Sequence, residues 1–177
     1  MKKVFISGFG TINPLGLNTE TTWENICNGK SGIDFIELFE TKEFTTKIAG
    51  EVKNFNPADH INKKSAQRMD RFAQFAVIAA LEALQHSKID LKQFDSYRIA
   101  VIVGSGIGGL STLSQQHEIL EKKGPSRVTP FLIPMMLSDM ASAQISMLTK
   151  ARGQNFSPVS SCSSGADAIG IGMKMIR

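Results

Sequence analysis

The sequence is poor in cysteine and in the larger aromatic residues: among 177 residues it has only Cys27 and Cys162, one Trp and one Tyr. This cysteine count is too low for a disulfide framework or a cysteine-ligated zinc cluster. So few stacking rings argue against binding of single-stranded nucleic acid. No apolar run approaches the ~20 residues of a membrane-spanning helix, and Val4–Ile6 is too short for a signal peptide. We therefore expect a soluble, cytoplasmic protein that binds neither nucleic acid nor membranes.

The chain also has little excess charge of either sign. Lys and Arg total 20 against 16 acidic residues, which gives a formal net charge of +4. This excess is too small for a protein that coats nucleic acid, but it is compatible with an acidic partner. The hydrophobic fraction of 42% is typical of a globular protein. A domain of this length buries a full core without metal or disulfide crosslinks.

Short β-branched segments alternate with longer amphipathic segments, which indicates an α/β fold with a parallel sheet. The expected strands are 4–6, 47–52, 99–103 and 155–161. The expected helices are 19–28, with its cap at Asn18 or Thr19, then 65–85, 110–122, 138–149 and 165–176. The last helix reaches Arg177 without a cap or a following strand, so one sheet edge lacks a partner. We therefore expect residues 1–177 to form one domain that is incomplete at its C-terminus.

Cys162 is the strongest candidate for a reactive group. It lies between the strand expected at 155–161 and a helix that starts with small residues, so its side chain is exposed at a strand-to-helix elbow. The N-terminus of a helix favours a negative charge, and the thiolate is the nucleophilic form of cysteine. The same free amides can hold an oxyanion after attack on an acyl carbonyl. Packing as a small buried hydrophobic residue remains the alternative for Cys162.

The other cysteine and the histidines carry weaker signals. Cys27 shares a helical stripe with Trp23 and Ile26, which favours a role in the core. The histidines are scattered, show no metal-ligand spacing, and form no recognisable pair with Cys162. They are His60, His86 and His117.

A glycine-rich segment, residues 104–109, reads Gly-Ser-Gly-Ile-Gly-Gly and follows an expected strand. It contains the G-x-G-x-x-G pattern of dinucleotide-binding turns. That motif also needs a second strand ending in an acid about 20 residues later, and residues 124–128 provide none. The alternatives are a dinucleotide-binding module and a turn that passes close to another part of the molecule.

Basic residues occur in two clusters, which are either solvated faces or a docking patch for an acidic protein. One cluster consists of Lys63, Lys64, Arg68 and Arg71, and the other of Lys122, Lys123 and Arg127.

Several of these segments, in this order, resemble the β-ketoacyl-acyl-carrier-protein synthases, specifically the elongating type II enzymes of fatty-acid synthesis. The resemblance runs from residue 3 to the end. It rests on Gly8-Phe9-Gly10 with Pro14-Leu15-Gly16, on Arg68-Met69-Asp70-Arg71-Phe72, on the glycine-rich segment, on Gly124-Pro125, Pro130-Phe131, Ile133-Pro134 and Met135-Met136, and on Cys162 with Gly165.

The resemblance implies a thiolase-like fold, of which this chain is the N-terminal half of an αβαβα sandwich. It implies a homodimeric acyltransferase without cofactor or metal, in which Cys162 takes an acyl chain from acyl carrier protein. Malonyl carrier protein then loses carbon dioxide, and its enolate attacks the thioester. By motif match, Ile107 lines or gates the acyl pocket and Phe131 reaches the pocket of the partner subunit. Lys64, Arg68 and Arg127 would dock the acidic carrier protein.

The chain departs from the family pattern in two ways. The family's second half carries catalytic histidines, a lysine and a glycine-rich loop, and these motifs are absent from the sequence, so we expect residues 1–177 alone to be inactive in condensation. The nucleophile motif is serine-rich, with Ser160-Ser161 before Cys162, and Pro158 falls inside the expected strand. A ketosynthase of a polyketide-like pathway therefore remains an alternative.

Overall fold

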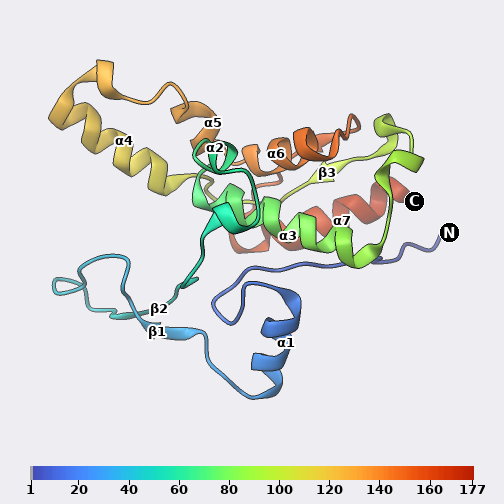
Figure 1. Cartoon of the computed structure of the whole chain (residues 1–177), viewed down its shortest axis with the longest axis horizontal. Helices are drawn as coiled ribbons and strands as arrows, with labels where there is room; N and C mark the ends of the chain where they lie inside the picture. The colour runs from blue at the N-terminus through green and yellow to red at the C-terminus, as the bar shows by residue number, and fades with distance from the viewer. Residues whose placement is uncertain (1) are drawn as a thin grey trace.

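A computed structural model describes residues 2–177 and shows a mixed α/β architecture in which helices dominate and strands are short (Figure 1). The helices are α1 (Thr19–Cys27), α2 (Lys63–Ala66), α3 (Arg71–Ser87), α4 (Leu110–Lys123), α5 (Leu132–Met136), α6 (Met140–Thr149) and α7 (Ser164–Ile176). The strands are β1 (Ile33–Phe35), β2 (Ile48–Gly50), β3 (Val101–Ile102) and β4 (Asn155–Phe156). Short 3₁₀ turns cover Pro57–Asp59, Leu91–Gln93, Ser96–Arg98, Pro125–Arg127 and Ser161–Ser163.

The core forms where α6 packs on one side against α3 and on the other against the parallel pair β3–β4. Val101 lies opposite Asn155 in this pair, α6 packs on both strands and on α3, and α7 packs on β3. Small and branched side chains allow the close approach of the two helices: Val77 is 1% exposed and Ala141 is fully buried. Because the strands are parallel, their carboxyl ends lie at the same edge. The glycine-rich segment and Ser161 therefore leave the sheet side by side.

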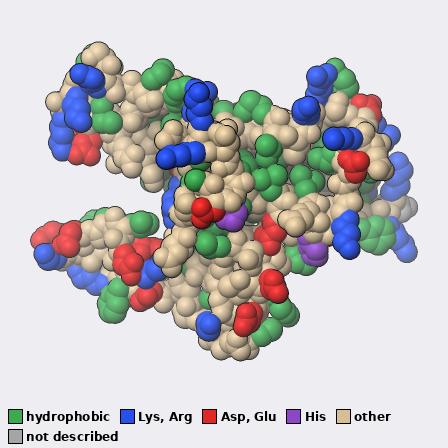
Figure 2. Space-filling view, in the orientation of Figure 1, with side chains coloured by type: hydrophobic (Ala, Val, Ile, Leu, Met, Phe, Trp, Pro, Cys, Tyr) green, Lys and Arg blue, Asp and Glu red, His purple; other side chains and the backbone are tan. Residues whose placement is uncertain are grey.

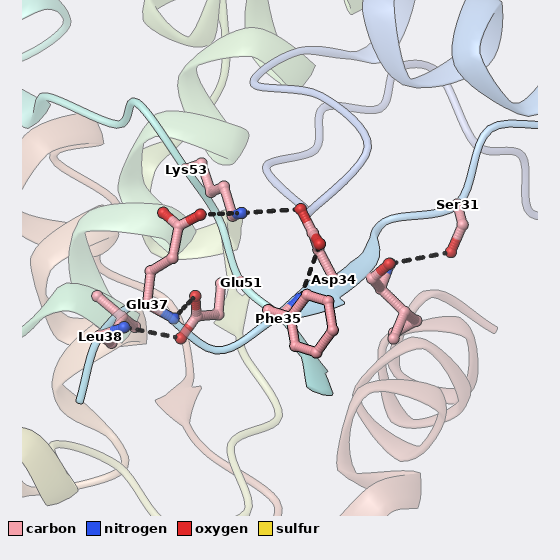
Figure 3. A network of polar contacts seen from close by, with 8 residues as sticks. Ser31, Asp34, Phe35, Glu37, Leu38, Glu51 and Lys53 are labelled. Atoms are coloured by element: carbon pink, nitrogen blue, oxygen red, sulfur yellow. Dashed lines mark hydrogen bonds and ion pairs between the residues drawn. The ribbon is translucent and has the colours of Figure 1, made fainter. Parts of the chain in front are cut away.

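The strand expected at 47–52 belongs to a separate antiparallel hairpin, in which β2 pairs with β1. Lys53 in this hairpin donates hydrogen bonds to Asp34 at 3.0 Å and to Glu37 at 2.6 Å (Figure 3). The carboxylate of Glu51 accepts hydrogen bonds from the backbone N–H groups of Glu37 and Leu38. The hairpin is thus held by a polar network on its exposed side and lies outside the parallel pair.

Three expectations from the sequence are wrong in detail. Within residues 2–177, Val4–Ile6 pairs with no other strand, and Phe5 is 79% exposed. The helix expected at 65–85 is divided into α2 and α3, because Asp70 has an extended backbone and caps the start of α3. Pro158 follows β4 instead of lying inside it, since a proline has no N–H to extend the ladder.

The first helix is capped as expected, but its apolar stripe is not covered. Asn18 accepts a hydrogen bond from the N–H of Thr21 at the start of α1. Trp23 is 66% exposed, and Cys27 is also exposed. The expectation that Cys27 lies in the core is therefore wrong. No helix in residues 2–177 is long and apolar enough to cross a membrane.

Candidate active site

Cys162 lies in the 3₁₀ turn Ser161–Ser163, between β4 and α7, and its side chain is exposed. Ser161 has φ +54, in the left-handed region that non-glycine residues seldom adopt. Such a conformation persists only where the surrounding contacts hold it. The chain therefore turns sharply just before Cys162 and presents the thiol near the N-terminus of the thirteen-residue helix α7.

Serine hydroxyls hold this turn together. The hydroxyl of Ser164 donates to the carbonyl of Ser161 at 2.7 Å and accepts from the N–H of Ser160 at 3.0 Å. Ser163 donates to the carbonyl of Ser160 at 2.9 Å. Ser160 in turn donates to the carboxylate of Asp167 in the first turn of α7. The serine-rich motif thus fixes the elbow, a role that the sequence analysis did not assign to these residues.

The glycine-rich segment, which we call the glycine turn (residues 104–109), lies against this elbow. A Cβ atom added to Gly104 would come within 2.0 Å of the Ser164 carbonyl oxygen, and one added to Gly106 would be 3.4 Å from the Ser161 carbonyl oxygen. Ile107 follows directly and is 71% exposed. The glycines therefore serve a close approach between two backbones, and they bring an exposed apolar side chain next to the elbow of Cys162.

The other end of the glycine turn meets a buried carboxylate. Asp70 is 6% exposed, and its Oδ2 accepts from the N–H of Thr112 at 2.9 Å and from the Thr112 hydroxyl at 2.6 Å. Its Oδ1 accepts from the N–H of Phe72, the second residue of α3. Asp70 therefore joins the starts of α3 and α4. Sequence reasoning missed this residue, although an Asp directly before an amphipathic run is a helix N-cap signal.

The residues expected to dock a carrier protein lie on α2, just before α3 and just after α4. The guanidinium of Arg68 lies 4.7 Å from the ring centroid of Phe131, so the structure brings these two candidates together. Lys64 is exposed on α2, and Arg127 is exposed in the 3₁₀ turn after α4. Basic side chains gather over the far end of α4 (Figure 2). Arg68 therefore lies beside Phe131, whereas Arg127 follows the opposite end of α4 from the end that Asp70 contacts.

The histidines lie elsewhere. His60 and His86 line an open groove of about 1270 Å³ between α1 and α3, and His117 lies on α4 beside Glu121. No hydrogen bond within residues 2–177 joins a histidine to Cys162, and no cluster of His, Cys, Asp and Glu there could hold a metal ion.

The elbow and the glycine turn together offer an exposed thiol, the amides at the start of α7 and the adjacent apolar side chain of Ile107. This arrangement is suited to acyl transfer.

Comparison with known proteins identifies the family. The family model described as the N-terminal domain of β-ketoacyl synthase matches residues 1–177. The chain belongs to the β-ketoacyl synthase family. Among curated relatives, the 3-oxoacyl-[acyl-carrier-protein] synthase 2 of Staphylococcus aureus is 44% identical over 176 residues, which cover 99% of this chain and 42% of that protein. The protein of the same name from Synechocystis is 38% identical over 176 residues, again 99% of this chain and 42% of that protein.

Solved structures show the same fold. A ketosynthase bound to its acyl carrier protein and a hexaketide, from a type II polyketide synthase, matches with a TM-score of 0.84 and 21% identity. That match covers 99% of this chain and 47% of the other. A β-ketoacyl synthase from Burkholderia phymatum matches with a TM-score of 0.82 and 23% identity, covering 99% of this chain and 44% of the other. The chain therefore has the thiolase-like fold of the N-terminal half of a ketosynthase and spans less than half the length of its curated relatives.

Proposed function

We propose that this chain supplies the nucleophile of a 3-oxoacyl-acyl-carrier-protein synthase that elongates fatty acids. The Cys162 thiolate attacks the carbonyl carbon of an acyl thioester, so that a C–S bond to Cys162 forms and the C–S bond to the carrier breaks. The carrier leaves as a thiolate, which takes up the proton that the Cys162 thiol released. Malonyl carrier protein then loses carbon dioxide. Its enolate carbon attacks the Cys162 thioester, and the cysteine thiolate leaves.

The observation that carries this proposal is the position of Cys162. The thiol is exposed at a sharp turn before α7, where the positive end of the helix dipole favours the oxyanion that forms after attack. The backbone amide of Cys162 would be one of the oxyanion donors. Ile107, on the glycine turn beside the elbow, offers the acyl chain an apolar surface.

The fatty-acid reaction is favoured over a polyketide-type reaction by the comparison with relatives. The proteins named 3-oxoacyl-[acyl-carrier-protein] synthase 2 reach 44% identity, whereas the polyketide ketosynthase is 21% identical and supports the fold alone. A dinucleotide site in the glycine turn is disfavoured because Gly104 and Gly109 already lie against protein backbone.

The proposal extends to partners. A carrier protein would dock on the exposed basic side chains of Lys64, Arg68 and Arg127. In support, a ketosynthase of the same fold has been solved in complex with its acyl carrier protein. We further propose a cytoplasmic homodimer in which Phe131, on the segment that precedes α5, reaches the pocket of the partner subunit.

The test is condensation by the complete natural protein, supplied with an acyl carrier protein in its acyl- and malonyl-loaded forms. The wild-type protein and the Cys27→Ala variant are expected to form β-ketoacyl product and release carbon dioxide. Cys162→Ala is expected to form no product. Equal product formation by both cysteine variants would refute the assignment of the nucleophile.

A further inference from the structure

Asp70 is a buried carboxylate that the proposed reaction does not use. Within residues 2–177 no lysine or arginine forms an ion pair with it. Its charge is met instead by the N–H groups of Phe72 and Thr112 and by the Thr112 hydroxyl. These donors belong to the first turns of α3 and α4, so both helix dipoles point their positive ends at this side chain.

The backbone of the glycine turn is confined between Asp70 and α5. A Cβ atom added to Gly109 would be 3.0 Å from Asp70 Oδ2 and 2.1 Å from the carbonyl oxygen of Met135. The N–H of Gly109 donates to the carbonyl of Met136 at 2.9 Å. Asp70 therefore packs against the end of the turn that lies two residues after Ile107, beside the hydrogen bond from Gly109 to Met136.

The opposite end of the turn is fixed by the elbow, through the contact of Gly104 with Ser164. Ile107 lies between these two anchors and is exposed, so its position relative to Cys162 depends on both. The elbow anchor is held by its own serine network and does not involve Asp70. Loss of the Asp70 anchor should thus move Ile107 and leave the thiol in place.

We propose that Asp70 is a positioning residue that holds Ile107 against the elbow and thereby sets how long an acyl chain Cys162 accepts. This inference rests on the proposed function. In this proposal a long alkyl chain on Cys162 runs along the glycine turn, over the exposed side chain of Ile107, whereas an acetyl group ends near the sulfur. The acylation rate with a long chain should therefore depend on Asp70 much more than the rate with acetate.

The experiment uses the complete protein and the variant Asp70→Asn. The amide has a single acceptor oxygen, so either Phe72 or Thr112 loses its acceptor. Acylation of Cys162 is followed by mass spectrometry with N-acetylcysteamine thioesters of octanoate and acetate. The octanoyl rate should fall by at least about tenfold, while the acetyl rate and alkylation by iodoacetamide change less than about threefold.

Variants at a second position separate positioning from general loosening of the fold. Thr112→Ser keeps the hydroxyl and should retain the wild-type ratio of octanoyl to acetyl rates, whereas Thr112→Val should lower it by about threefold. Glu82→Gln is the matched control, because Glu82 is the other carboxylate on the α3 side that accepts two backbone N–H groups, those of Thr11 and Thr19. It should leave the ratio unchanged.

The proposal is overturned if Asp70→Asn lowers both acylation rates equally, if it changes neither, or if Glu82→Gln changes the ratio as much. Should Asp70→Asn fail to fold, an unchanged ratio in Thr112→Val overturns it. If the wild-type protein forms no acyl-Cys162 with either thioester, the proposed function itself fails, which is a separate result from an unchanged ratio.

Discussion

At the scale of single residues, Cys27 and Cys162 form a natural comparison because both thiols are exposed. Cys27 is the last residue of α1, at the negative end of the helix dipole. Cys162 lies two residues before the start of α7, at the positive end of that helix. The two exposed thiols therefore lie at opposite ends of their helices.

We predict that iodoacetamide alkylates Cys162 faster than Cys27 near neutral pH. Each helix end contributes roughly 0.3–1 kcal/mol, so the ratio of the two rates should lie between about threefold and thirtyfold. Peptide mass spectrometry after short exposure of the native protein gives both rates in one sample. Equal rates, or faster alkylation of Cys27, would contradict the electrostatic account of the elbow.

At the scale of elements, the glycine turn and the elbow support each other. Gly104→Ala would place a methyl group 2.0 Å from the Ser164 carbonyl oxygen, which neither backbone can accommodate without moving. We predict a loss of several kcal/mol of stability and slower alkylation of Cys162. Gly170→Ala is the control, since nothing lies within 4 Å of its added Cβ. Gly170→Ala should stabilise α7 by about 0.5–1 kcal/mol and leave the alkylation rate of Cys162 unchanged. Thermal unfolding measures the stability of the two variants, and peptide mass spectrometry measures the alkylation rate.

The β1–β2 hairpin should depend on pH through its charges. The hydrogen bond from Lys53 lowers the pKa of Asp34, and the hydrogen bond to Glu37 raises the pKa of Lys53. The stabilisation from Asp34 is thus present above its ordinary pKa of about 3.9 and is lost as the pH falls through the lowered value. The stabilisation from Lys53 is complete below about pH 10.4 and is lost as the pH rises through the raised value.

We therefore predict that Lys53→Met speeds hydrogen exchange of the Ile36 amide, which donates to the Lys47 carbonyl across the hairpin. The effect should appear at neutral pH, shrink with added salt, and vanish in acid. Lys42→Met is the control, because the Lys42–Glu40 pair is more than three-quarters exposed on both sides. An Ile36 effect that is equal in both variants, or independent of salt, would contradict the role of the Lys53 network.

Sequence patterns predicted the helices well and the strands poorly, for a physical reason. The cap Asn18 and the apolar periodicity of α4, α6 and α7 are local signals, and these helices lie within a few residues of their expected bounds. Val4–Ile6 has strand composition, but a strand exists only if a partner pairs with it. The contacts of Asp70 and Gly104 join segments more than 40 residues apart; Asp70 and Thr112, for example, are separated by 42 residues. No local sequence pattern could therefore predict these contacts.

At the scale of the whole molecule, large apolar side chains are exposed over much of the described surface. Phe5 is 79% exposed, and Ile169 on α7 is 69% exposed. Apolar surface of this extent is typical of a site where other segments or subunits pack. The relatives are more than twice as long as this chain, so activity is best measured on the complete natural protein.

The basic residues predict a difference between large and small substrates. Arg68→Glu with Arg127→Glu should lower kcat/KM for acyl carrier protein by at least about tenfold at low salt, because charge steering acts on the encounter of large partners. The rate with a small acyl thioester should stay within about twofold, and the defect should diminish as salt rises. An equal loss with both substrates would mean that these arginines serve the fold, for example through the Arg68–Phe131 contact.

The central claim is that Cys162 carries the acyl chain, and the most direct measurement is to locate that chain. The complete protein is incubated with acyl carrier protein loaded with octanoate, quenched in acid, digested and analysed by mass spectrometry. Our account predicts the octanoyl mass on the peptide that contains Cys162 and on no other, and its loss in Cys162→Ala but not in Cys27→Ala. An octanoyl group on a different residue, or one that persists in Cys162→Ala, would contradict the account.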